Sequence, residues 1–278
     1  PADRPRPPVR SDAGDRVSFE VPEALMDRMH EFARTHQVTP ANVLLALYCA
    51  LLQRWTGQEE VVVGLPVRAR ERPELERIIG FFVDVVPLRL PLDGAASFDG
   101  TVRRVTTATL EALAHGDMPF ELLVQELNPP RDFSRTPIYQ TIFSFQDGRH
   151  RPRHVGDARL RMMAFSPGTS QVDLGLWFVD FGNRLTGALD FSTDLFDHAT
   201  VERMRDQLLQ ALAAALEAPA AAVATLPMLA PAERARLDAA NATRVDGFAD
   251  TPVTALVAAT VARRPDAVAV SSGGASLT

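Results

Sequence analysis

Apolar and polar residues alternate over residues 16–21 (RVSFEV), which is the pattern of a half-buried strand. The residues that follow place Leu25, Met29 and Phe32 at helical spacing behind Pro22, and proline suits the first turn of a helix. We therefore expect an amphipathic helix that packs its apolar face against a sheet.

The next helix is predicted to be the most buried part of the chain. Thr39 can cap it, Pro40 fits its first turn, and Gly57 is a suitable stop. The run between them, VLLALYCALLQRW, is apolar on nearly every side. Cys49 lies in this run, where a buried inert thiol is the default. A single cysteine forms no intramolecular disulfide, which predicts a cytoplasmic protein.

Further along the chain, the pattern predicts several strands and helices. The expected strands are 59–67, 80–90, 136–146 and 158–165, with a hairpin over 173–191 that turns at Gly182-Asn183. Of these, 80–90 is apolar enough to lie deep in a sheet, with Pro87 near its end. The expected helices run from Ser97 to about His115, over 119–127, and from a cap at Asp197 to about 218. The order predicts an α/β fold, with a mixed sheet and packed helices in two layers.

Charge and composition narrow the class of protein. The formal net charge is −6, the pI is about 5.6, and no cluster of Lys and Arg is free of acidic neighbours. We therefore expect no nucleic-acid partner and no membrane partner. No segment reaches the roughly 18–20 apolar residues of a membrane span. The N-terminus is proline-rich and charged, and Pro1 is not a translation start, so we expect a piece of a longer protein.

The stretch HGDMPFELL (115–123) raises the question of a general base, because an imidazole beside a carboxylate is a common catalytic pair. Residues two apart do not face each other on a helix, so a His115–Asp117 pair would be a feature of a turn. The local interpretation is that His115 ends one helix and Asp117 caps the next. We favour the local interpretation.

Other candidate sites are weaker. His150 and His154 have the spacing of a helical metal pair, but Pro152 lies between them, so we expect a loop and no metal. The remaining histidines lie in or beside helices without a ligand pattern: His30, His36 and His198. Ser134 could be a nucleophile, although local ion pairs among Arg131, Asp132 and Arg135 explain its surroundings better. The sequence contains no GxSxG, P-loop or dinucleotide motif.

Three stretches, taken in order, resemble motifs of condensation domains from nonribosomal peptide synthetases. They are IIGFFVDVVPLRL (78–90), HGDMPFELLVQEL (115–127) and RDFSRTPIYQTIFSFQ (131–146), against family patterns of about IGxFVNxxxLR, HxDxPFE and RDxSRxPL. DRPRPP resembles the linker between the two halves of such domains, and TSQVDLGLWF and LDFSTDLFD resemble later strands. The tail resembles the junction into an adenylation domain.

The resemblance implies one lobe of a chloramphenicol-acetyltransferase-like fold, in which two lobes form a V around a tunnel. It divides the chain into an inter-lobe linker (1–15), the C-terminal lobe (16–220), a second linker (221–240) and a truncated start of an adenylation domain (241–278). That last fragment lacks the nucleotide-binding motifs of its family. The expected partners are the N-terminal lobe, the adenylation domain and carrier proteins.

The family forms amide bonds between substrates carried on phosphopantetheine arms, and no cofactor is expected to bind the lobe directly. The family's catalytic HHxxxDG motif is missing, because no two histidines are adjacent in this chain. We therefore expect no catalytic residue here and an inactive chain on its own. Asp84 also replaces the family's usual Asn. The resemblance implies tunnel and motif residues at Gly80, Phe82, Asp84, His115, Asp117, Pro119, Phe120, Glu121, Arg131, Asp132, Ser134, Arg135, Ser170 and Asp173, the last two on a strand between the lobes.

Two alternatives stay open. The chain could be an inactive half-domain that docks acidic carrier proteins through a basic surface, with candidates at Arg68, Arg70, Arg72, Arg149, Arg151 and Arg153. It could also be a stand-alone acyltransferase with a shared site, although it lacks a suitable histidine. The leading hypothesis also predicts a large exposed apolar patch where the missing lobe would sit.

Overall fold

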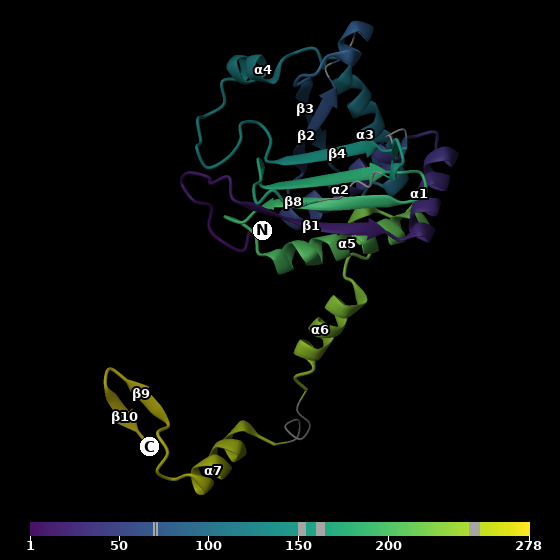
Figure 1. Cartoon of the computed structure of the whole chain (residues 1–278). Helices are drawn as coiled ribbons and strands as arrows, with labels where there is room; N and C mark the ends of the chain where they lie inside the picture. The colour runs from purple at the N-terminus through teal and green to yellow at the C-terminus, as the bar shows by residue number, and fades with distance from the viewer. Residues whose placement is uncertain (69, 71, 150–153, 160–164, 245–250) are drawn as a thin grey trace. The chain divides into compact units, whose positions relative to one another are not determined.

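A six-stranded mixed sheet is the centre of the first of two units, Pro1–Ala230 (Figure 1). The computed structural model describes residues 1–278 except 69, 71, 150–153, 160–164 and 245–250. The strand order is β1-β8-β7-β4-β2-β3, with β4 parallel to both β2 and β7 and the other pairs antiparallel. The strands are β1 (Gly14–Val21), β2 (Glu60–Arg68), β3 (Val83–Pro91), β4 (Thr141–Asp147), β7 (Leu174–Asp180) and β8 (Leu185–Ser192).

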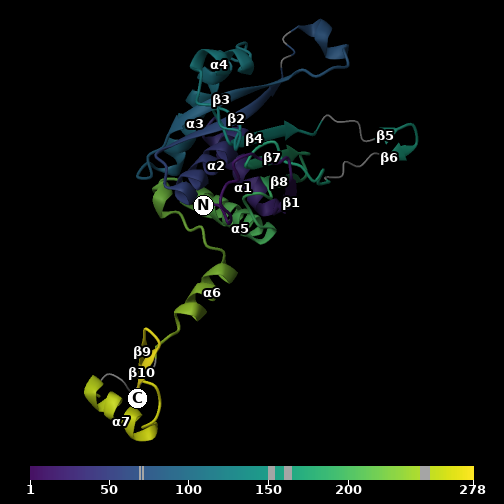
Figure 2. The same ribbon diagram turned by 90° about the vertical axis from the view of Figure 1, so that its left-hand side faces the viewer.

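Four helices pack on one face of this sheet and form the main core with it. They are α1 (Glu23–Thr35), α2 (Pro40–Thr56), α3 (Phe98–Leu113) and α5 (His198–Glu217). A shorter helix, α4 (Phe120–Leu127), contacts β3. Short 3₁₀ turns lie at Pro73–Arg77 and Val223–Thr225, and a separate two-stranded sheet pairs β5 (His154–Val155) with β6 (Ala158–Arg159; Figure 2). The predicted α/β fold is confirmed.

Helix α2 has the boundaries and the burial that its sequence predicts. The Thr39 side chain accepts a hydrogen bond from the Asn42 amide (3.2 Å), Pro40 opens the first turn, and Gly57 ends the helix at φ 71°. Every residue from Asn42 to Leu52 is buried. Burial raises the pKa of the Cys49 thiol to about 12, which keeps it protonated and unreactive.

One hydrogen-bonded chain joins α2 to the middle of the sheet. The buried Tyr48 hydroxyl meets the Thr141 hydroxyl, which itself donates to the Leu174 carbonyl oxygen (2.7 Å). Burial also raises the pKa of Tyr48, so its hydroxyl remains a donor at neutral pH. These hydrogen bonds link α2, β4 and β7 at one point.

Side chains alternate across the sheet, so β7 shows which residues face the helices. Leu174, Leu176 and Phe178 belong to the helix-side core, and Trp177 points to the other side. That other side, which we name the second face, carries a smaller apolar cluster. Its members are buried Tyr139, Ile142 and Val172 with partly buried Val62, Val85, Phe120 and Trp177.

A strand is confirmed over most of residues 80–90, but its predicted position deep in the sheet is wrong. β3 begins only at Val83 and is an edge strand, paired with β2 alone. The residues just before it include Ile79 and Phe81, whose side chains are 102% and 90% exposed. Pro87 lies in mid-strand opposite Gly64, a position that an edge strand tolerates because proline donates no hydrogen bond.

The remaining strand and helix predictions have mixed outcomes. The hairpin is confirmed: β7 and β8 are antiparallel, and Gly182 adopts φ 84° in their turn. Only the first two residues of the predicted strand 158–165 are observed, in β6, and 160–164 lie outside the described residues. Asp197 stands at the N-cap position of α5, but its side chain pairs with Arg4 and makes no capping bond, so that part of the prediction is wrong.

Part of the predicted second linker packs in the first unit. Val223 and Leu226 are buried there, and Ala222 forms a bridge with Ser97. The second unit, Pro231–Thr278, contains α6 (Pro231–Asn241), α7 (Val253–Arg263), β9 (Val270–Ser272) and β10 (Ala275–Leu277). None of its described residues is buried. Within the described chain, no helix has the length and hydropathy to cross a membrane.

The hydrogen bonds from Tyr48 through Thr141 to Leu174 predict which of two variants is less stable. Thr141→Val leaves the buried Tyr48 hydroxyl without a partner and should lower the free energy of unfolding by about 1–3 kcal/mol. Tyr48→Phe leaves the Thr141 bond to Leu174 intact and should lower it by only about 0.5–1.5 kcal/mol. Urea denaturation of the two variants measures the difference, and equal losses or the reverse order would contradict this chain of bonds.

Candidate functional site

Two of the motif stretches meet in an aromatic contact on the second face. The Tyr139 ring lies over Gly64 so closely that a Cβ there would come within 2.9 Å of it. Phe120, the first residue of α4, packs beside it with 5.2 Å between ring centroids. Gly64 is therefore the residue that lets Tyr139 reach the strand surface and bring HGDMPFE against RDFSRTPIY.

Two carboxylates from separate motifs act on Tyr139. Burial raises the pKa of its hydroxyl most, and the negative charges of Asp84 and Glu121 raise it further. Asp84 is half-buried at the start of β3 and accepts a hydrogen bond from the Val85 amide (2.7 Å). All three motif stretches contribute to one apolar cluster, through Val85, Phe120 and Tyr139.

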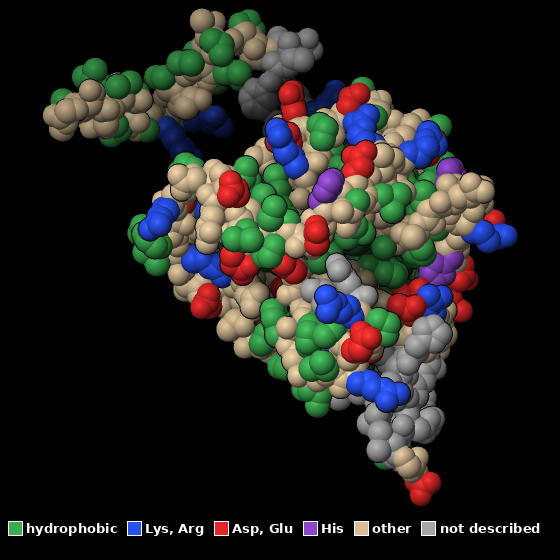
Figure 3. Space-filling model, turned by 90° about the horizontal axis from the view of Figure 1, so that it is seen from above, with side chains coloured by type: hydrophobic (Ala, Val, Ile, Leu, Met, Phe, Trp, Pro, Cys, Tyr) green, Lys and Arg blue, Asp and Glu red, His purple; other side chains and the backbone are tan. Residues whose placement is uncertain are grey.

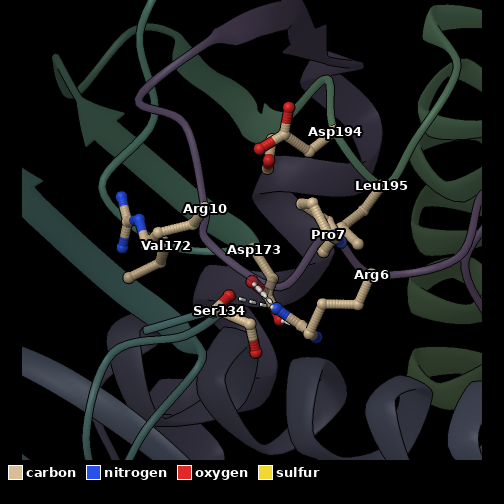
Figure 4. A pocket seen from close by; sticks show the side chains of 9 residues that line it. Arg6, Pro7, Arg10, Ser134, Val172, Asp173, Asp194 and Leu195 are labelled. Carbon is tan, nitrogen blue, oxygen red and sulfur yellow. Dashed lines mark hydrogen bonds and ion pairs between the residues drawn. The ribbon is translucent and has the colours of Figure 1, made fainter. Parts of the chain in front are cut away.

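The N-terminal segment is tied to two further motif residues through Arg6 (Figure 4). The Arg6 guanidinium binds both carboxylate oxygens of Asp173, with one contact at 3.0 Å, and donates to the Ser134 carbonyl oxygen at 3.0 Å. The hydrogen bond to Asp173 raises the pKa of Arg6. A two-pronged guanidinium suits this task because it holds a carboxylate and a carbonyl at once.

Arg10 fastens the same segment a few residues further on. Its amide donates to the Phe133 carbonyl oxygen (3.0 Å), and its guanidinium donates to the carbonyl oxygens of Ser170 (3.0 Å) and Gln171. The Ser170 hydroxyl is turned inward to the Val172 carbonyl oxygen (2.7 Å). The pocket in Figure 4 is therefore filled by structural contacts of this segment.

The turn at residues 131–135 is local structure. Arg135 pairs with Asp132 (2.7 Å), whose carboxylate also accepts a hydrogen bond from the Ser134 amide (2.9 Å). The Ser134 hydroxyl lowers the pKa of Asp132 most, followed by the Ser134 amide. The predicted Asp132–Arg135 pair is confirmed. Arg131 makes no ion pair with the described residues, so its predicted part in that set is wrong.

His115 and Asp117 form no catalytic pair. α3 ends at Leu113, the chain turns through exposed His115 and Asp117, and no ion pair joins those two side chains. The prediction that Asp117 caps α4 is wrong, because Pro119 stands at the N-cap and no side chain caps that helix. Asp117 lies two residues too early in the chain for that role.

Four other predicted site residues lie just before strands. Ser170 and Asp173 precede β7, which begins at Leu174, so they are not on a strand as predicted and contact the N-terminal segment instead. Gly80 and Phe82 precede β3, and the Arg70 guanidinium stacks 4.0 Å from the centre of the Phe82 ring.

The basic candidates are mostly engaged locally. Arg68 pairs with Glu76, Arg149 with Asp147, and Arg70 donates to the Leu75 and Ile78 carbonyl oxygens. Arg151 and Arg153 lie outside the described residues. Figure 3 shows basic and acidic side chains intermixed over the visible surface, with no field of one sign. On the face that Figure 3 shows, the described arginines form no continuous basic surface.

The histidines form no metal site in the described part of the chain, where no three His, Cys, Asp or Glu side chains cluster suitably. His154 lies in β5, which is incompatible with a helical metal pair, and His150 lies outside the described residues. His198 pairs with Asp15 (2.8 Å) and His30 lies 3.4 Å from Asp180. His36 stacks on Phe32 with 3.9 Å between ring centroids.

Sequence reasoning missed three residues of this region: Arg6, Tyr139 and Trp177. Arg6 lay within DRPRPP, and Trp177 followed the strand alternation of DLGLWFVD, so both signals were present. Neither pattern predicts which residue the side chain contacts. Arg6 and Asp173, for example, are 167 residues apart in the sequence.

Comparison with solved structures identifies the fold class of the protein. At 20% identity, a crystallised four-domain nonribosomal peptide synthetase bound to AMP and glycine superimposes with a TM-score of 0.81, covering 99% of this chain and 22% of that one. The X-domain in complex with OxyB from teicoplanin biosynthesis gives a TM-score of 0.74 at 26% identity, over 83% of this chain and 51% of that one. The fold is thus the mixed α/β fold of condensation domains.

The family assignment rests on sequence. The condensation-domain model matches residues 1–237. Tyrocidine synthase 3 of Brevibacillus parabrevis is 36% identical over 271 residues, which cover 97% of this chain and 4% of that protein. Phosphinothricin tripeptide synthetase PhsB of Streptomyces viridochromogenes is 36% identical over 286 residues, covering 100% and 24%. The chain belongs to the condensation-domain family, and it spans a quarter or less of these two relatives.

The Arg6 contacts predict a stability difference between two arginines of the same segment. Arg6→Met breaks a bond to a carboxylate that is 21% exposed and should lower the free energy of unfolding by about 1–3 kcal/mol. Arg4→Met breaks a pair whose side chains are 47% and 56% exposed and should lower it by about 1 kcal/mol or less. Chemical denaturation compares them. Equal effects would show that Arg6 does not hold the segment.

The effect of the Ser134 hydroxyl on the Asp132 pKa can be tested. Ser134→Ala removes the largest cause of the low pKa of Asp132, so that pKa should rise toward its ordinary value. A carboxylate with a lowered pKa stabilises the fold above its unfolded pKa, and that contribution is lost as pH falls through the folded pKa. Carboxyl ¹³C titration reads the change, with Asp99, lowered chiefly by Ser97, as the unmoved control. A constant Asp132 pKa would rule out this hydrogen bond.

Proposed function

We propose that this chain supplies the C-terminal lobe of a condensation domain, which joins two carrier-tethered substrates through an amide bond. The observation that supports it best is the convergence of three family motifs on the second face, through Val85, Phe120 and Tyr139. In this proposal the second face forms one wall of the tunnel. The amine of one substrate attacks the thioester carbonyl of the other there, and the thiol of the phosphopantetheine arm leaves.

The chemical step is assigned to the other lobe. This chain has no HHxxxDG motif, and His115 is exposed and forms no ion pair with a carboxylate among the described residues. The lobe described here would contribute shape, orientation and exclusion of water, which together make the encounter of two tethered groups effectively intramolecular. In this proposal Gly80 and Asp84 lie near the tunnel, and the Asp117–Glu121 and Arg131–Arg135 segments act as scaffold.

The expected partners follow from the same proposal. They are an N-terminal lobe, two carrier proteins with phosphopantetheine arms, and an adenylation domain, whose first residues would be 241–278. A cytoplasmic location remains a prediction from the single cysteine. The alternative of a basic carrier-docking half-domain has less support, because Arg68, Arg70 and Arg149 have local partners.

Reconstitution tests the proposal. The chain is produced together with, or fused behind, the HHxxxDG-bearing lobe encoded directly upstream, and is given two carrier proteins loaded with aminoacyl thioesters. Mass spectrometry of the carriers should detect a dipeptidyl thioester on the acceptor carrier. The chain alone, and the pair with the second motif histidine changed to Ala, are the controls.

The outcomes are distinct. Dipeptide from the intact pair and none from either control supports the proposal. An equal yield from the chain alone would place the catalytic group in this chain, and no dipeptide from any correctly folded pair with its native carriers would remove the amide-forming role.

A further inference from the structure

Residues 3–12, which we name the N-terminal strap, are bound to the first unit through their backbone near both ends. The Asp3 amide donates to the Leu195 carbonyl oxygen at 2.9 Å. Seven residues further on, the Arg10 amide donates to the Phe133 carbonyl oxygen at 3.0 Å. These two hydrogen bonds fix the strap to two separate loops of the unit.

Asp3 supplies the cap that α5 does not receive from its own N-cap residue. The Asp197 side chain, at the N-cap position, makes no capping bond. The Asp3 carboxylate instead accepts hydrogen bonds from the Asp197 amide (2.8 Å) and from the Thr200 hydroxyl (2.9 Å). A helix favours negative charge at this end, and the bond from the Asp197 amide lowers the pKa of Asp3 most. The strap is therefore joined to a helix that packs in the main core.

Side chains along the strap bind three loops that lie at the same end of the sheet. Arg6 binds the loops before β4 and before β7, and Arg10 binds the loop before β7 (Figure 4). Ser11 binds Asp194, just after β8, through both its amide (2.8 Å) and its hydroxyl (2.9 Å). The loops are neighbours because β7 pairs with β4 on one side and with β8 on the other.

Prolines stiffen the strap between these contacts. Pro5, Pro7 and Pro8 stand between or beside the binding residues, and each has a restricted φ and no amide hydrogen. Pro7 also lies against the unit beside Leu195, in the pocket of Figure 4. A hinge needs residues whose backbone angles change freely during the motion. Anchored residues alternating with proline provide few such angles, so the strap is poorly suited to bending.

We propose that the N-terminal strap moves with this lobe as one rigid body, so that the bending between the two lobes takes place on the N-terminal side of Asp3. The proposal rests on the proposed function, because it requires a second lobe upstream. Tyr139 and Val172 follow closely after the loops that the strap fastens. The second face therefore keeps its shape while the lobes move relative to each other.

Amide hydrogen exchange tests the rigidity of the strap in the chain itself. After correction for intrinsic rates, the amides of Asp3, Arg10 and Ser11 should exchange about tenfold or more slowly than the amide of Val9. Val9 is the internal reference because it is 65% exposed and its amide donates to no described atom. NMR measures each rate. Equally fast exchange at all four residues would overturn the proposal.

Two spin-label distances in the two-lobe domain locate the bend. One pair joins Val9→Cys on the strap to Glu31→Cys on α1, and both positions are exposed. The other pair joins Glu31→Cys to an exposed cysteine on the upstream lobe. Burial raises the pKa of Cys49 to about 12, so this thiol should stay unlabelled.

The first distance should have one narrow distribution that is the same in the chain alone and in the two-lobe domain, with or without carrier proteins. The second distance reports the spread of lobe positions. A distance from Val9→Cys to Glu31→Cys that shifts or broadens when the upstream lobe is attached would place the bend within the strap and overturn the proposal.

A double variant tests whether the side chains hold the strap. Arg6→Met with Arg10→Met keeps the prolines but removes the guanidinium contacts, so it should widen the first distance distribution and speed exchange at Ser11. The matched control is Arg103→Met, which breaks a 2.8 Å ion pair with Asp99 on α3 and should change neither measurement. An unchanged distribution in the double variant would contradict the fastening that the proposal requires.

Failure of the proposed function is distinguishable from failure of this inference. It would appear as absent dipeptide in reconstitution, whereas the exchange rates and the first label distance are measured without any reaction.

Discussion

The burial of α2 against one face of the sheet is the constraint on which the rest of the first unit depends. A helix that is apolar on nearly all sides has to be covered, and the strands, α1, α3 and α5 provide that cover. Each strand then points alternate side chains away from α2. These side chains form the second face. They do not belong to the main core, and they carry the separate cluster that includes Tyr139 and Trp177.

The parallel insertion of β4 between β2 and β7 determines where the motifs meet. Because β4 and β7 are adjacent and parallel, both strands begin at the same end of the sheet. The turn that precedes β4 and the loop that precedes β7 are therefore neighbours there. Arg6 bridges them by binding the Ser134 carbonyl oxygen and Asp173, so a segment that is distant in sequence holds the two entrances together.

Features set by neighbouring residues were predictable from sequence. The limits of α2 follow from Thr39, Pro40 and Gly57, and the hairpin follows from Gly182 with the alternation around it. Features that depend on which strands pair could not be predicted from sequence. The edge position of β3 depends on which strands flank β2, and nothing within residues 80–90 records that. The candidate site divides in the same way. The motif sequences indicated Asp84, Phe120 and Glu121, but the packing of Phe120 on Tyr139 depends on the absent side chain of Gly64 and on the register of β2 with β4.

The central claim is that the second face, and not the helix side, meets the tethered substrate. Proximity labelling measures this directly in the two-lobe domain, with a carrier protein whose pantetheine ends in a bromoacetamide. Val62→Cys places a thiol on the second face, and Leu209→Cys places one in the groove between α1 and α5. Both positions are apolar and partly exposed. If the second face meets the substrate, Val62→Cys should cross-link rapidly and Leu209→Cys very little, and the reverse preference would contradict that role of the second face.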